Sequence, residues 1–140
     1  MKFKVSPSTE AFINGQRAHY VQEVQISAFG KKIRTNIDMY GDGPIFSSKT
    51  LDAYSKVMGN PEKEVLAVME AASKRLAASG EEVAVKDMKA NVDYLTFHFS
   101  TAFNGSKAFY SVGFGYKGNE HLFELEFVDG KSTGNVSMNG

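Results

Sequence analysis

The three histidines carry most of the reactive chemistry that this sequence offers, because the chain contains no cysteine. His19, His98 and His121 all fall in segments with the alternating pattern of β-strands. Imidazole titrates near neutral pH, so a histidine beside a tyrosine on a concave sheet can serve as a general base. Alternation places His98 on the same strand face as Tyr94. His98 is therefore the candidate catalytic residue, and the competing interpretation is a polar histidine on the solvent face of a strand.

The spacing of the polar residues matches no metal-binding or cofactor-binding motif. No histidine has a second histidine or a carboxylate at the spacing of a metal motif such as His-Glu-x-x-His. The loop at residues 41–44 lacks the lysine and hydroxyl of a P-loop and the repeated acidic residues of a calcium loop. We therefore expect neither a metal nor a cofactor.

A glycine-aromatic segment at residues 112–117 suggests a different chemistry. Its Gly-Phe-Gly-Tyr centre resembles the middle of the RNP1 motif of RNA-recognition domains, in which exposed aromatic rings stack on bases. The resemblance implies that Phe114 and Tyr116 contact single-stranded nucleic acid. Val112 stands where the motif has a basic residue, and Lys117 stands where it has an apolar one. The alternative is a strand whose core face consists of Tyr110, Val112, Phe114 and Tyr116.

The elements that must position these residues begin with β structure. Asn14-Gly15 is a favourable tight-turn dipeptide, and the residues after it alternate between apolar and polar side chains. One buried face and one wet face is the pattern of an antiparallel meander. The expected strands of this half are residues 2–6, 12–13, 17–29 and 33–39.

The hydrophobic period then changes from two to about 3.6 residues, which indicates helices. Ser47 or Ser48 can cap a short helix that Gly59 ends. Asn60 and Pro61 start a longer helix that runs to residue 79. Its apolar stripe consists of Val65, Val68, Met69, Ala72 and Leu76.

The C-terminal half returns to strands. Val83 and Val85 mark a short strand, and the alternating pattern then resumes in longer segments. We expect the rings of Phe97, Phe99 and Phe123 to pack under the helix of residues 61–79. The three longer expected strands are residues 93–103, 107–116 and 121–128.

The last residues, 129–140, are rich in glycine and serine, which predicts a frayed tail. Val136 and Met138 alternate with polar residues, so a short edge strand is the other interpretation of this segment.

The pattern as a whole predicts one α+β domain over residues 1–140. We expect an antiparallel sheet of six to eight strands in two meanders, packed against one long and one short helix inserted mid-chain. Residues 11–20 resemble residues 102–110, so the meanders are either an internal duplication or two hairpins that share the same turn chemistry.

Charge and hydropathy exclude some classes of partner. Sixteen basic residues balance sixteen acidic ones, which disfavours a general nucleic-acid binder. No stretch approaches the roughly 18 apolar residues of a membrane span, and the N-terminus lacks the apolar run of a secretory signal. We therefore expect a cytoplasmic protein without a membrane partner.

Aromatic residues are the feature that exceeds expectation, with 11 phenylalanines and 6 tyrosines. Aromatic side chains bury large areas and are enriched at protein interfaces. The leading hypothesis is therefore a non-catalytic protein-binding or regulatory domain, of an inhibitor or immunity type, that acts through a sheet face or edge. Open strand edges also provide a route to a homodimer. The expected binding residues are Tyr94, His98, Tyr110, Phe114 and Tyr116.

Two other functions stay open at this stage. A small-ligand-binding protein or an enzyme of hydrolytic or isomerase type would enclose a pocket between a curved sheet and the helix, with His98 and Tyr94 on its wall. A single-stranded nucleic-acid binder would use Phe114 and Tyr116.

Overall fold

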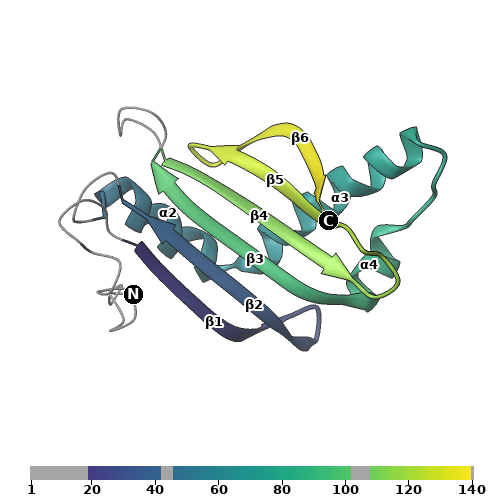
Figure 1. Cartoon of the computed structure of the whole chain (residues 1–140), viewed down its shortest axis with the longest axis horizontal. Helices are drawn as coiled ribbons and strands as arrows, with labels where there is room; N and C mark the ends of the chain where they lie inside the picture. Colours follow the sequence, from purple (N-terminus) through teal and green to yellow (C-terminus); the bar gives the residue numbers. More distant parts are fainter. Residues whose placement is uncertain (1–18, 42–45, 102–107, 140) are drawn as a thin grey trace.

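The computed structural model describes residues 19–41, 46–101 and 108–139, and these form one sheet with helices on one of its faces (Figure 1). The α+β class is confirmed. The described part contains six strands, in the order β1-β2-β3-β4-β5-β6 across the sheet. Its elements are β1 (His19–Ala28), β2 (Lys31–Tyr40), α2 (Ser48–Gly59), α3 (Pro61–Ala78), α4 (Val85–Asn91), β3 (Val92–Thr101), β4 (Ala108–Tyr116), β5 (Leu122–Val128) and β6 (Lys131–Asn139).

The sheet joins a hairpin, β1-β2, to a meander, β3-β4-β5-β6, through one parallel contact between β2 and β3. A parallel pair needs a crossover, and the three helices supply it behind the sheet. The predicted arrangement of two meanders is therefore not confirmed. The expected strands at residues 2–6 and 12–13, the Asn14-Gly15 turn and most of the sequence repeat lie outside the described residues.

The helices follow the predicted apolar stripes. The Oγ of Ser47 accepts a hydrogen bond from the amide of Thr50 and caps α2. Pro61 begins α3, where a proline suits the first helical turn. The whole predicted stripe of α3 is buried, namely Val65, Val68, Met69, Ala72 and Leu76. These two helices therefore present their apolar sides to the sheet, as the sequence predicts.

One local prediction, the short strand after the long helix, was wrong. The expected short strand at Val83 and Val85 is absent, because Val85 begins α4, a helix of seven residues that buries Met88 completely. The apolar positions Val85, Met88 and Val92 have the spacing of a helix face and not of a strand.

The C-terminal segment is also ordered differently from the frayed tail that its composition suggested. A tight turn at Asp129 and Gly130, both with positive φ, returns the chain to pair with β5 as β6. The apolar side chains of Val136 and Met138 reach the core from this strand, as in the alternative interpretation. Their burial stabilises an edge strand that local propensity alone does not favour.

The core lies between the sheet and the helices. The rings of Phe97, Phe99 and Phe123 are fully buried in it, as expected. Helix α2 packs on β3 and β4, and α3 packs on β4, β5 and β6. The three helices of the described residues therefore cover one face of the sheet, and none of them lies on the opposite face, which points toward the viewer in Figure 1.

Candidate interaction surface

We call the sheet face that points away from the helices the open face. Alternation of the strands places polar and aromatic side chains on it, since their neighbours along each strand are buried on the helix side. The parallel register of β2 and β3 sets Asp38 beside His98, and the antiparallel register of β3 and β4 sets Ser111 on the other side of His98. His98 thus lies at the centre of a row that runs across the strands.

Aromatic rings flank His98 on the open face. The centroid of the Tyr40 ring lies 4.9 Å from that of His98. His19, on β1, stacks on the other side of Tyr40 with centroids 4.1 Å apart and planes inclined by 14°. Three rings on three adjacent strands therefore form a continuous ladder at one end of the open face.

Burial dominates the electrostatics of His98. The half-buried position lowers the pKa of His98 below its ordinary value of 6.5, and the neighbouring charges of Asp38 and Glu124 oppose this effect. The nearby His19 adds a smaller lowering of the same pKa. His98 is therefore predominantly neutral at pH 7, with an uncharged ring available for stacking or hydrogen bonding.

A second aromatic feature lies further along β2 and β3. The guanidinium carbon of Arg34 lies 5.0 Å from the ring centroid of Tyr94, a cation–π distance. Beside this pair is a hollow of about 110 Å³, which Glu23, Arg34, Thr35, Asn36 and Tyr94 line. The open face therefore combines a stacked Arg–Tyr pair with a recess of side-chain size.

In the middle of the open face, the side chains of Glu124 and Thr96 pack over the backbone of Gly113. A Cβ atom built at Gly113 would lie 2.8 Å from both the Glu124 Cγ and the Thr96 Cγ2. The two side chains thus close over the glycine backbone. The Glu124 carboxylate also accepts a hydrogen bond of 3.1 Å from the side-chain amide of Asn139. Gly113 therefore permits a close-packed patch that a larger residue would disrupt.

The row Asp38, His98, Ser111 has the residue types of a serine hydrolase triad. Such catalysis needs the histidine hydrogen-bonded to both partners. Within the described part of the chain, no hydrogen bond joins these three side chains. The arrangement brings the right groups near one another without connecting them.

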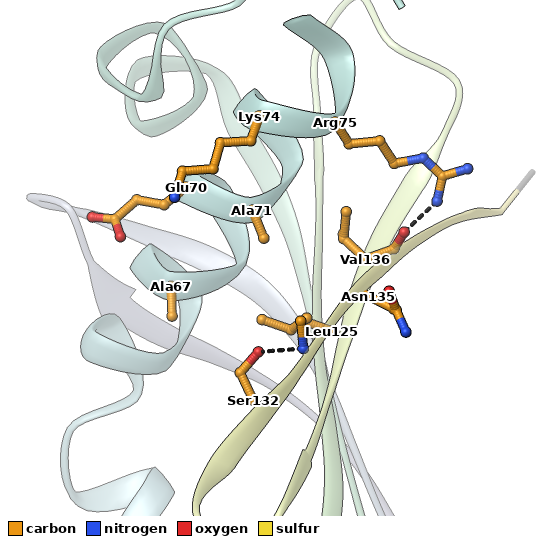
Figure 2. Close-up of a pocket in the computed structure, with 10 residues that line it drawn as sticks. Ala67, Glu70, Ala71, Lys74, Arg75, Leu125, Ser132, Asn135 and Val136 are labelled. Carbon is orange, nitrogen blue, oxygen red and sulfur yellow. Dashed lines mark hydrogen bonds between the residues drawn. The ribbon is translucent and has the colours of Figure 1, made fainter. Parts of the chain in front are cut away.

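Two grooves lie between the helices and the sheet. A groove of about 690 Å³ runs between α3 and β6, with Ala67 and Ala71 of the helix facing Leu125 (Figure 2). The guanidinium of Arg75 donates a hydrogen bond to the Val136 carbonyl at its end. A smaller groove of about 260 Å³ lies between α2 and β4. Neither is lined by His98 or Tyr94, because these two residues are on the opposite face of the sheet.

The structure separates the five predicted binding residues into two groups. Tyr94 and His98 share the open face. Tyr110 and Phe114 point to the helix side and are 3% and 0% exposed, and the centroid of the Tyr116 ring lies 6.0 Å from those of both Phe114 and Phe123 on that same side. The rings of Tyr110 and Phe114 are therefore core, as the alternative interpretation of their strand proposed. This burial leaves Phe114 unable to stack on a nucleic-acid base.

Sequence reasoning missed Tyr40, Arg34 and Glu124 as members of the candidate surface. Alternation alone places Arg34 and Tyr40 on the polar face of their strand, so a signal for them was present. Their proximity to Tyr94 and His98 was not visible, because it depends on the parallel register of β2 and β3.

Among the described residues, no group of three or more histidine, aspartate and glutamate side chains is placed to hold a metal ion. The helices of the described segments are too short or too polar to cross a membrane. Comparisons of the chain with protein-family models, with curated proteins and with solved structures found no match. The surface chemistry of the open face is therefore the basis for assigning a function.

Proposed function

We propose that this chain is a non-catalytic protein-binding domain of a regulatory or inhibitory kind, and that its open face contacts the partner. The observation that carries the proposal is the recess beside the Arg34–Tyr94 pair on a face that no helix of the described residues covers. Tyrosine and arginine are the side chains most enriched where interfaces gain their binding energy. A recess of side-chain size next to them suits an anchoring side chain of the partner.

The charges of the open face indicate the kind of partner surface. Glu23, Asp38, Glu124 and Glu126 contribute carboxylates to this face, whereas Lys32 and Arg34 of β2 are cations on it, and Arg34 is already stacked on Tyr94. An excess of carboxylates favours a partner with basic residues opposite. We therefore expect association to become slower and weaker as the salt concentration rises.

Site-specific photocrosslinking in the native cell tests the proposal. A benzophenone amino acid replaces either Glu126, exposed on the open face, or Glu70, exposed on α3 on the helix side. Covalent adducts with the same protein from position 126, and few from position 70, would support the open face. Adducts mainly from position 70 would move the interface to the α3–β6 groove, and adducts from neither would contradict protein binding.

Variants of the anchoring pair refine this experiment. Tyr94→Ala and Arg34→Ala should each reduce the adduct from position 126 several-fold, because they remove the aromatic wall and the cation of the recess. Lys63→Ala, at an exposed position of α3, serves as the matched control and should leave the adduct unchanged. Equal adduct yields from all three variants would contradict the assigned anchor.

Serine hydrolysis is the second candidate, and the row Asp38, His98, Ser111 favours it. A fluorophosphonate probe tests it directly, because an activated serine attacks the phosphorus and fluoride leaves. Labelling that disappears in both Ser111→Ala and His98→Ala would make this chain an enzyme. We expect no labelling, since no hydrogen bond links the three side chains in the described structure.

A further inference from the structure

The two edges of the sheet are built differently. At the β6 edge the register with β5 shifts between Leu125 and Phe127, and Gly134 has a φ of +85°. Arg75 also donates a hydrogen bond to the Val136 carbonyl, which is then not available to another strand. Bulges and capped backbone groups of this kind protect an edge from pairing with another strand. The β1 edge has no such feature: its ten residues pair with β2 in an unbroken register.

The turn between β1 and β2 determines which backbone groups of β1 face outward. Phe29 and Gly30, at φ 53° and 77°, form a two-residue turn that closes the pair Ala28 and Lys31. Hydrogen-bonded residues alternate along an antiparallel strand from that closing pair. The residues that direct their N–H and C=O away from β2 are therefore Val21, Glu23, Gln25 and Ser27.

These outward N–H and C=O groups of β1 have no hydrogen-bond partner among the described residues. No hydrogen bond from any described residue reaches the outer edge of residues 21–27. The side chains nearby are also incompletely covered. Val21, on the open face, is 36% exposed. Val24 and Ile26, on the helix side, are only partly buried, since the helices pack mainly on β3 to β6. Glu23 is the sole ionisable residue of this stretch.

We infer that two copies of this chain pair antiparallel through their β1 edges, about a twofold axis that passes through Val24. In this register Glu23 lies opposite Gln25 of the second copy, and Val21 lies opposite Ser27. Every outward N–H and C=O of residues 21–27 then gains a partner. Val24 meets its own copy as a non-hydrogen-bonded pair on the helix side.

The side chains of β1 favour a second copy as the occupant. A carboxylate faces an amide, a larger apolar residue faces a small one, and no like charges are opposed. A shift of the axis to Glu23 would set two carboxylates opposite one another, and a shift to Gln25 would leave Val21 outside the pairing with Ser27. One register therefore satisfies both the backbone and the side chains, and the resulting sheet continues through both copies.

Disulfide trapping at the axis tests this arrangement. The chain contains no cysteine, so Val24→Cys introduces a single thiol. In a non-hydrogen-bonded pair the two Cα atoms lie about 4.5 Å apart, within reach of a disulfide. Gln22→Cys is the matched control on the same strand face, where the two thiols would be offset by four residues, about 13 Å along the strand.

We expect mild oxidation to convert Val24→Cys largely into a covalent dimer and Gln22→Cys hardly at all. Sedimentation velocity over micromolar concentrations should show a dimer for the unmodified chain. Gln25→Pro removes an outward N–H and leaves the hydrogen bonds between β1 and β2 in place, so this variant should sediment as a monomer. Gln25→Thr keeps the N–H and should sediment as a dimer.

Three outcomes would overturn the inference. One is equal crosslinking of the two cysteine variants, and another is a dimer that persists in Gln25→Pro. The third is a monomer at every concentration. If the amides of Val21, Glu23, Gln25 and Ser27 resist hydrogen exchange in that monomer, another segment of the same chain occupies the edge.

Discussion

His98 shows how a single residue on an open sheet face can remain uncharged between two carboxylates. Desolvation disfavours the imidazolium, and this effect exceeds the attraction from Asp38 and Glu124. The neutral ring of His98 suits a surface built from aromatic contacts, because no charge on His98 then has to be desolvated beside the Tyr40 ring.

This balance predicts a pH-dependent stability. The lowered pKa of His98 means that the unfolded chain takes up the proton first as the pH falls below about 6.5. The free energy of unfolding should therefore decrease between that pH and the lower pKa of the folded state. Urea unfolding at pH 7.5 and 5.5 measures the decrease, which His98→Gln should reduce. His121→Gln, at an exposed position, is the control and should retain the wild-type decrease.

Tyr110 provides a prediction at the alkaline end. Burial, the charge of Glu64 and a hydrogen bond to that carboxylate raise the pKa of Tyr110 from 10.0 to about 12. Between these values the unfolded phenol ionises and the folded one does not, so stability should fall as the pH rises through this window. Tyr110→Phe should cost about 1 kcal/mol at neutral pH and reduce the alkaline loss. Tyr94→Phe should leave the alkaline loss unchanged, and an equal effect of both variants would contradict the assignment.

At this scale, the sequence predicted which side of its strand a residue occupies better than which residues meet. Alternation placed His98 and Tyr94 together and gave the buried face of Tyr110 and Phe114 as an alternative. The aromatic rings of that strand drew attention because of their size, although size is also what favours their burial. Contacts such as that of Tyr40 with His98 follow from the pairing of strands about sixty residues apart, which local periodicity does not encode.

Among the elements, β4 contains two glycines on the open face whose surroundings differ. A Cβ at Gly113 would lie 2.8 Å from side-chain carbons and 2.9 Å from the Phe123 carbonyl, whereas a Cβ at Gly115 would meet only the Tyr94 Cβ at 3.8 Å. Gly113→Ala should therefore lower the free energy of unfolding by about 1–3 kcal/mol through overpacking. Gly115→Ala should be neutral or stabilising by about 0.5–1 kcal/mol, because alanine restricts the unfolded chain. Urea denaturation of the two variants checks the prediction, and equal changes would contradict it.

The edge strand β6 depends on a contact from a helix. Arg75 donates to the Val136 carbonyl, while Lys74, beside it on α3, makes no hydrogen bond to β6 among the described residues. Arg75→Met should accelerate hydrogen exchange of the β6 amides several-fold and leave β3 and β4 unchanged. Lys74→Met should not alter exchange in either region. Faster exchange throughout the sheet would indicate general destabilisation and contradict this local role.

Elements with a strong hydrophobic period were predictable from the sequence, and elements that depend on tertiary contacts for their order were not. The buried stripe of α3 was predicted residue by residue, since five apolar side chains on one helix face leave little alternative. By contrast, β6 is rich in glycine and serine and gains its order from Val136, Met138 and Arg75. The short α4 was missed because Val83 and Val85, two residues apart, match the alternation of a strand.

At the scale of the molecule, the helices of the described residues cover one side of the sheet, and none of them covers the open face or the β1 edge. The core and the proposed binding surface therefore lie on opposite sides of the same strands. Adjacent residues of β3 contribute alternately to folding and to the proposed binding. Tyr94 and His98 lie on the open face, whereas Leu95 and Phe97 lie in the core. Stability and association should then be separable by substitutions only a few positions apart.

The pair Phe97→Ala and Tyr94→Ala tests this separation. Phe97 is fully buried, so its truncation should cost about 3–5 kcal/mol, a large part of the stability of a domain of this size. Tyr94 is only half-buried, so Tyr94→Ala should cost much less while it removes the aromatic wall of the recess. Thermal unfolding and the crosslink from position 126 measure the two properties on the same samples. A Tyr94→Ala variant that loses stability as severely as Phe97→Ala would show that the open face contributes to the fold, and the division between the two faces would then be wrong.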